Sequence, residues 1–105
     1  MEKRVYECPA ADFGRLKTLL GKDPYAPVSF ARQGYVLKEG KAVGGEAGKY
    51  YVQLKGEADF FKWAEEKFKE LPNVKRAPKE MEEKIIKVIE EEESAAESGF
   101  GSLFG

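Results

Sequence analysis

The chain has 105 residues, 42% of them apolar, which is enough for one domain with a single modest core. The chain has 18 Lys and Arg and 19 Asp and Glu, and such a high content of charged residues is typical of thermophilic proteins. It has no His, which excludes His-based metal sites and His-dependent catalysis. The single cysteine excludes an internal disulfide, and no apolar run approaches the roughly 18 residues of a membrane span, so we expect a cytoplasmic protein without a membrane partner.

The first third of the chain predicts a strand, a helix and a stiff loop. Residues 4–8 alternate polar and apolar side chains, and Pro9 ends this strand because it lacks a ladder donor. Apolar residues then recur at helical spacing up to Gly21, a candidate C-cap, and Asp12 is a candidate N-cap. The result is a predicted helix of about ten residues, followed by a loop held by Pro24 and Pro27.

The middle of the chain predicts an antiparallel hairpin and a second helix. Residues 28–38 and 49–55 are expected to be its strands, and residues 40–48 its mobile, glycine-rich loop. The apolar parity changes within the first strand, which indicates a bulge near Gly34. An apolar stripe over residues 59–71 then predicts a helix that Pro72 terminates.

The last part predicts a third helix and an acidic arm. Residues 73–77 fit either a short strand or a connection, and Pro78 suits the first turn of a helix. Met81, Ile85, Val88 and Ile89 line one side of that helix. Four glutamates at residues 90–93 sit at its negative dipole end, so we expect the helix to fray there. The predicted division is a globular domain over residues 1–90 and a flexible, disordered acidic tail over residues 91–105.

This order of elements predicts an α+β fold: a ferredoxin-like antiparallel sheet with helices on one face and an extra C-terminal helix. The other sheet face would display tyrosines and aliphatic residues, and a homodimer would bury it. The candidate interface residues are Tyr6, Tyr35 and Tyr51. The alternative is that the final helix folds back over this face within one chain.

The net charge of −1 is the sum of a basic N-terminal part and an acidic C-terminal part of the chain. Residues 1–79 hold 16 basic and 11 acidic side chains, and residues 80–105 hold 2 basic and 8 acidic ones. A basic body with an acidic arm suits an RNA-facing protein, although ordinary solvated surface is the alternative. The candidate RNA or ribosome contacts are Arg32, Lys38, Lys41, Lys49, Lys75, Arg76 and Lys79.

The sequence does not predict an enzyme. It offers no nucleophile and base arrangement, and its paired glutamates fall on predicted exposed helix faces, where solvation explains them. The glycine-rich loop ends in Gly48 and Lys49, but Val43 and Tyr50 occupy positions where a phosphate-binding loop needs Gly and Ser or Thr. We therefore expect no catalytic residues, cofactor or metal.

The ending of the chain places three large apolar side chains at i, i+3 and i+4. Phe100, Leu103 and Phe104 would share one face of a helix, which is the helix-in-groove mode of recognition, and Gly99 and Gly105 flank them. An acidic run, a small-residue stretch and then a Gly-(Leu or Phe)-x-x-Leu-Phe-Gly ending resemble the tail of the archaeal and eukaryotic acidic ribosomal stalk proteins. The resemblance covers about a sixth of the chain and does not extend to the helical body of those proteins.

The resemblance implies translational GTPases as partners of the tail, because the stalk ending captures such factors. In overall size and tail, the chain is also similar to the archaeal ribosome dimerisation factors, which pair small subunits and block joining of the large one. That similarity implies a homodimeric, non-enzymatic factor on the ribosome, with the small subunit favoured and a hibernation or anti-association role. The alternative is a small regulatory or ligand-binding domain whose apolar ending docks on itself or on a partner subunit.

Overall fold

The computed structural model describes the backbone of residues 1–104 and the side chains of residues 1–95. The four strands form one antiparallel sheet in the order β2-β3-β1-β4, which confirms the α+β class. The strand order is compatible with a ferredoxin-like arrangement, which stays a prediction. In chain order the elements are β1 (Glu2–Pro9), the 3-10 helix η1 (Ala10–Asp12), α1 (Phe13–Leu20), α2 (Phe30–Gln33), β2 (Tyr35–Glu39), α3 (Gly40–Val43), β3 (Lys49–Gly56), α4 (Ala58–Phe68), β4 (Lys75–Arg76) and α5 (Lys79–Phe104).

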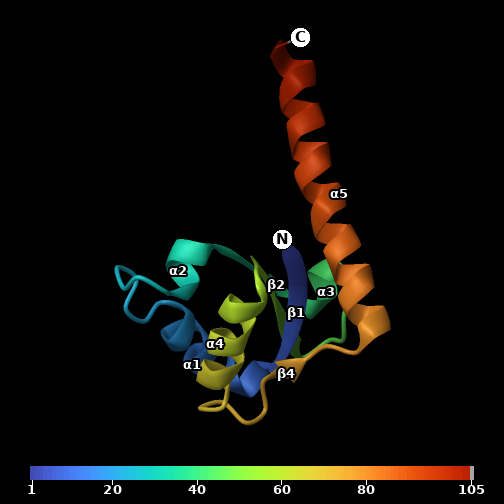
Figure 1. Ribbon diagram of the computed structural model, residues 1–105. Helices are drawn as coiled ribbons and strands as arrows, with labels where there is room; N and C mark the ends of the chain where they lie inside the picture. Colours follow the sequence, from blue (N-terminus) through green and yellow to red (C-terminus); the bar gives the residue numbers. More distant parts are fainter. Residues whose placement is uncertain (105) are drawn as a thin grey trace.

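Helices lie on both faces of this sheet (Figure 1), so the prediction of helices on one face is wrong. The larger core lies between the sheet and the helices α1, α2 and α4, with Leu16, Phe30 and Phe61 among its buried members. The smaller core lies on the other face, where α5 folds back over the sheet within one chain. Val5, Val43, Tyr51, Ala77, Ile85 and Ile89 are buried there.

Two of the three tyrosines that were predicted at a dimer interface are core residues. Tyr6 is 2% exposed in the larger core, and Tyr51 is 1% exposed in the smaller one. Only Tyr35, at the start of β2, is exposed, at 40%. Because α5 covers the second sheet face, burial of that face does not require a second subunit.

The segment before β2 contains a helical turn where the sequence predicted a strand. Ser29 caps α2, since its hydroxyl accepts a hydrogen bond from the Arg32 backbone N–H. Gly34 ends the turn at a φ of 87°, a value that favours glycine. The change of apolar parity therefore comes from a helical turn that buries Phe30, and not from a bulge in a strand.

The glycine-rich loop is also partly helical. It contains α3, whose Val43 is fully buried in the smaller core. Gly44 caps α3 in the left-handed region. At Gly40 a Cβ atom would lie 2.0 Å from the Glu46 carbonyl oxygen, so only glycine fits at the start of α3. The loop thus contributes Val43 to the core, which its glycine-rich composition did not predict.

Helix α5 is continuous through the four glutamates and reaches Phe104, so the predicted fraying near residue 93 is not seen in its backbone. Its first half packs on the sheet, and its second half extends away from the body (Figure 1). The flexibility of residues 91–105 stays a prediction, and Gly105 lies outside the described residues. In the described part of the chain, no helix combines the length and apolarity needed to cross a membrane.

Candidate functional site

The predicted docking residues lie at the far end of α5. The last described contacts between this helix and the body are ion pairs from Glu90 to Lys3, at 2.7 Å, and from Glu92 to Lys38, at 3.3 Å. Residues 93–104 continue the helix beyond them, which at 1.5 Å per residue adds about 18 Å. The backbone at Gly99, Phe100, Leu103 and Phe104 thus belongs to the projecting part of α5, while their side chains lie outside the described residues.

Several of the predicted RNA contacts converge at one end of the sheet. Lys49, at the start of β3, and Lys75, in β4, both approach the carboxylate of Glu7, at 3.4 and 3.9 Å. Lys49 also pairs with Glu46 at 2.6 Å. Arg76 follows Lys75 in β4, and it lines a shallow hollow together with Lys79, the first residue of α5. Lys49 and Lys75 thus lie around Glu7, and Arg76 and Lys79 lie beside Glu82 and Glu83. We call these four residues the basic group, although acids lie among them.

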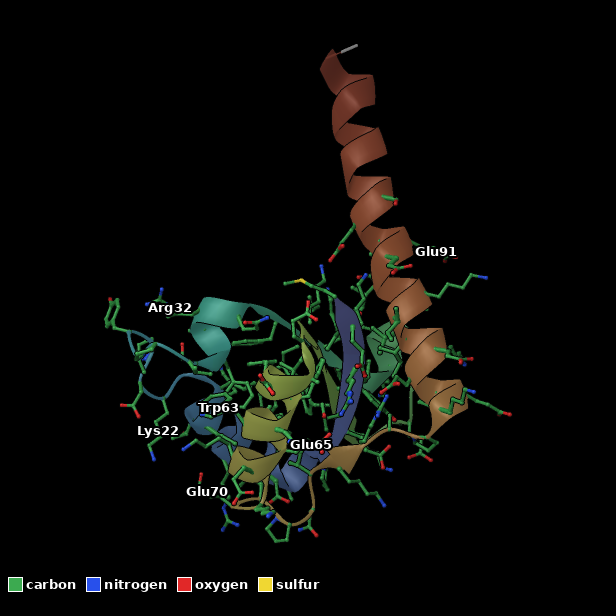
Figure 2. All side chains as sticks on the ribbon, viewed as in Figure 1. Lys22, Arg32, Trp63, Glu65, Glu70 and Glu91 are labelled. Carbon is green, nitrogen blue, oxygen red and sulfur yellow. The ribbon has the colours of Figure 1, made fainter. Side chains whose placement is uncertain are left out.

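The other three predicted RNA contacts do not join this group. Lys38 lies in β2, at the opposite edge of the sheet, and pairs with Glu92 of α5. Lys41 is exposed on α3. Arg32 lies on α2, across the molecule from the Glu91 of α5 (Figure 2). A single surface for all seven predicted residues is therefore ruled out by the fold.

An open hollow of about 640 Å³ lies near the basic group, beside α4 and β4. We call it the basic hollow. Arg4, Lys69, Lys75 and Arg76 line it with a single acid, Glu65. Apolar side chains from Phe68, Pro72 and Val74 complete its wall. Hollows of this size that combine apolar walls with a few convergent polar groups are the usual form of ligand sites.

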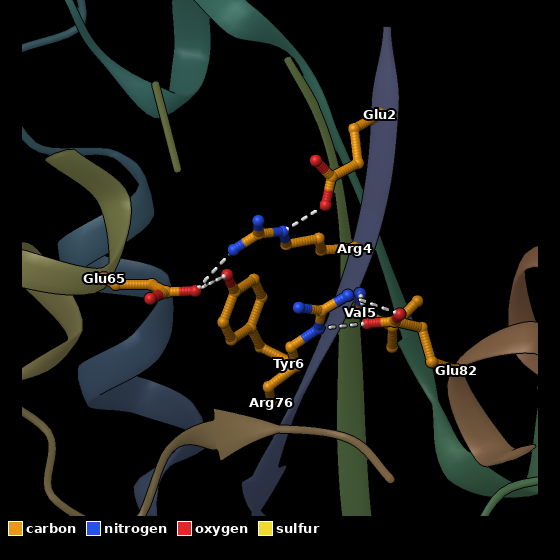
Figure 3. Close-up of polar contacts among 7 residues, drawn as sticks. All are labelled: Glu2, Arg4, Val5, Tyr6, Glu65, Arg76 and Glu82. Carbon is orange, nitrogen blue, oxygen red and sulfur yellow. Dashed lines mark hydrogen bonds and ion pairs between the residues drawn. The ribbon is translucent and has the colours of Figure 1, made fainter. Parts of the chain in front are cut away.

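Polar side chains on the β1 side of the hollow hold each other in place (Figure 3). The Tyr6 hydroxyl donates to Glu65 Oε2 at 2.6 Å, and Arg4 Nη1 donates to the same oxygen at 2.9 Å. Arg4 Nε also donates to Glu2, and its guanidinium lies 4.5 Å from the centre of the Phe61 ring. Burial, together with the bond to Glu65, raises the pKa of Tyr6, so its hydroxyl stays protonated at neutral pH.

A second polar contact joins the hollow to α5. Glu82, which is only 7% exposed, accepts two hydrogen bonds of 2.8 Å from Nε and Nη2 of Arg76. It also accepts the Val5 backbone N–H at 3.0 Å, which takes the place of a strand partner beyond the short β4. Burial opposes the ionised carboxylate, but the bonds from Arg76 and Val5 outweigh it and hold the pKa of Glu82 below its ordinary value.

Sequence reasoning identified Lys75 and Arg76 but missed Arg4, Glu65 and Lys69. The only available signal was that Arg4 and Tyr6 lie two residues apart in a strand and therefore on one face. Lys69 caps the end of α4 and, within the described residues, forms an ion pair with exposed Glu66, so from the sequence it is an ordinary surface lysine. The hollow forms because the end of α4 and β4 are packed beside β1.

No protein-family model, curated protein or solved structure matches this chain. In the part of the chain that the structure describes, three or more His, Cys, Asp or Glu side chains do not gather in a metal-binding cluster. The free thiol of Cys8 is buried, and burial raises its pKa to about 11. The basic hollow and the projecting end of α5 are thus the two candidate sites for a ligand or a partner.

Proposed function

We propose that the protein is a non-enzymatic, cytoplasmic factor of translation. Its body binds the ribosome, with the small subunit favoured, and its C-terminal segment docks on translational GTPases. The observation that carries the proposal is the course of α5, which is anchored on the sheet by its first half and leads the stalk-like ending away from the body. A C-terminal segment that belonged to the core of the chain would be expected to pack against the body.

The docking step follows from the spacing of three residues. In a helical segment, Phe100, Leu103 and Phe104 gather on one side and present an apolar stripe to a groove. Two or three such anchors in a water-excluded groove typically carry most of the binding energy of a small interface. The four glutamates before them keep the segment soluble and disfavour its collapse onto an apolar surface.

The body supplies the second contact through the group of Lys49, Lys75, Arg76 and Lys79. Basic side chains that are exposed on one surface bind phosphate backbones with an affinity that falls as salt rises. A role in blocking subunit joining needs only this contact and one chain. Pairing of two small subunits would need a two-fold body, and the sheet face that suggested one is covered by α5.

The tail is tested with the full-length protein and a Leu103→Ala, Phe104→Ala variant. We expect the variant to lose binding to purified translational GTPases almost completely, because two anchors are together typically worth several kcal/mol. Its melting temperature should be unchanged. A Glu91→Ala, Glu93→Ala variant is the matched control on the same helix and should retain binding.

Two results would contradict this function. Unchanged GTPase binding by the Leu103→Ala, Phe104→Ala variant would remove the docking role. A large fall in its melting temperature would instead favour the alternative, in which the ending docks on its own body or on a partner subunit. Sucrose-gradient fractions of a native lysate test the body separately, since the protein should migrate with small subunits at low salt and leave them as salt rises.

A further inference from the structure

The basic hollow contains one carboxylate, Glu65, whose negative charge disfavours a purely anionic ligand. Lys69, Lys75, Arg4 and Arg76 line the hollow, but Glu65 lies among them. A simple phosphate in this hollow would be attracted by Lys69, Lys75 and Arg76 and repelled by Glu65, whose charge Arg4 compensates only in part. A ligand that carries hydrogen-bond donors next to its anionic group would satisfy both.

The cations keep free donors for the anionic part of such a ligand. Arg76 uses Nε and Nη2 for Glu82, and Nη1 has no partner among the described side chains. Lys75 and Lys69 are 72% and 73% exposed, and their ion pairs with Glu7 and Glu66 are of the weak surface kind. A phosphate can therefore replace water at these groups without breaking the buried bonds of Glu82.

Glu65 keeps a free acceptor for the neutral part of the ligand. Both Tyr6 and Arg4 donate to Oε2, which leaves Oε1 without a partner among the described residues. The two bonds, drawn in Figure 3, fix the carboxylate, which lines the hollow. A fixed carboxylate oxygen is a common acceptor for a ribose hydroxyl, as in dinucleotide-binding sites. The 2′-hydroxyl is also the group by which proteins distinguish RNA from DNA.

We propose that the basic hollow binds one ribonucleotide, with its phosphate at Lys69, Lys75 and Arg76 and its ribose hydroxyl on Glu65. The inference rests on the proposed contact between the body and ribosomal RNA, and it names the unit of RNA that is recognised. A single-stranded segment fits best, because its sugar and phosphate are not held in a duplex. The same chemistry would admit a free ribonucleotide.

The test measures fluorescence anisotropy of a labelled six-nucleotide RNA and of the DNA with the same bases, with the full-length protein at about 50 mM salt. We expect the RNA to bind several-fold more tightly than the DNA. Lys69→Ala and Lys75→Ala should each weaken RNA and DNA alike, by about threefold to tenfold. Lys62→Ala, an exposed lysine of α4 that does not line the hollow, is the matched control and should change neither.

Glu65→Gln is the decisive variant, because it removes the carboxylate but keeps the shape of the side chain. We expect it to reduce the preference for RNA over DNA at least threefold, because a neutral amide is a weaker acceptor for the ribose hydroxyl. Displacement of the RNA by millimolar AMP would assign the hollow to a free ribonucleotide, and failure to displace it would assign the hollow to an RNA strand. Either result supports the proposed chemistry when the variants behave as stated.

Three results would overturn the inference: no saturable binding of RNA, equal affinity for RNA and DNA, or equal effects of Lys62→Ala and Lys69→Ala. Unfolding curves of each variant show whether a loss of binding reflects a loss of structure. Ribosome association is measured on the same variants. If it persists while the oligonucleotide does not bind, the hollow is not the RNA site, and the proposed function stands through another part of the body.

Discussion

The bond from α5 to the sheet edge predicts a stability defect in a Glu82→Gln variant. Glu82 accepts two bonds from Arg76 and one from the Val5 backbone N–H, all between 2.8 and 3.0 Å. Glutamine keeps one carbonyl oxygen but loses the negative charge and one acceptor. Glu83→Gln is the matched control, because Glu83 is the next residue of the same helix and is exposed.

The expected cost can be worked from these contacts. A hydrogen bond to a charged group contributes about 1.5 to 3 kcal/mol net when it is buried. The Arg76 side chain is 44% exposed, so water compensates part of its loss, and the glutamine oxygen can still accept the Val5 N–H. We therefore expect Glu82→Gln to lower the free energy of unfolding by about 2 kcal/mol. In a domain of this size that corresponds to a fall in melting temperature of about 8 to 16 °C.

The pH dependence gives a second check on the same bond. The pKa of Glu82 in the folded protein lies below its ordinary value of 4.5. Its ionised form therefore stabilises the fold fully above that ordinary value, and this contribution is lost as the pH falls through the lower, folded-state pKa. Thermal unfolding followed by circular dichroism should show a gap between the parent protein and Glu82→Gln at pH 7 that closes as the pH falls below 4.5. Equal melting temperatures for Glu82→Gln and Glu83→Gln at pH 7 would refute the reasoning, as would a gap that stays constant with pH.

Two further substitutions test the smaller core. Gly45→Ala would place a Cβ atom 2.4 Å from the ring of Tyr51, which is 1% exposed and cannot move into solvent. We therefore expect urea unfolding to show a free energy of unfolding that is lower by about 1 to 3 kcal/mol. An unchanged free energy of unfolding would mean that the ring can move. Gln53 is 2% exposed, and its Oε1 has no hydrogen-bond partner among the described residues, so Gln53→Met should raise the free energy of unfolding by about 1 kcal/mol. A destabilised Gln53→Met variant would show that the amide is satisfied in solution.

Elements with a long and regular apolar pattern were predicted well from the sequence. The stripe on α5 was correct in its members, since Ile85 and Ile89 are buried and Met81 and Val88 are partly buried. The segment before β2 was not predicted, because its structure depends on two local features and not on a period. A serine cap at Ser29 and a left-handed glycine at Gly34 are sufficient to fold one helical turn.

The partner of an apolar helix face is harder to predict than the face itself. The sequence left open whether the second sheet face is covered by another subunit or by α5 of the same chain. Both arrangements bury the same residues, so the apolar pattern cannot distinguish them. The structure resolves this because residues 77–78 directly join β4 to α5, which places the helix beside the sheet. A short connection thus favours the intrachain arrangement over dimerisation.

The basic hollow could not be predicted, for a different physical reason. Its polar groups come from β1, from the end of α4 and from β4, and each of these segments also carries solvated charges that look the same in the sequence. What distinguishes Arg4 and Glu65 is that Glu65 accepts hydrogen bonds from both Tyr6 and Arg4, which holds the two charged side chains in place. Such fixation is a property of packing, and charge patterning along a single chain does not report it.

Arg76 links the two features on which the proposals depend, because it lines the basic hollow and also holds the first half of α5 through Glu82. One edge of its guanidinium fixes Glu82 and thereby the first half of α5, while Nη1 is free for a ligand in the basic hollow. A ligand that takes only this free donor leaves the anchor of α5 intact. The proposed RNA contact of the body and the proposed docking of the C-terminal segment therefore do not compete for this residue. A factor that must hold a ribosomal subunit while it presents a docking segment to a second partner needs this independence.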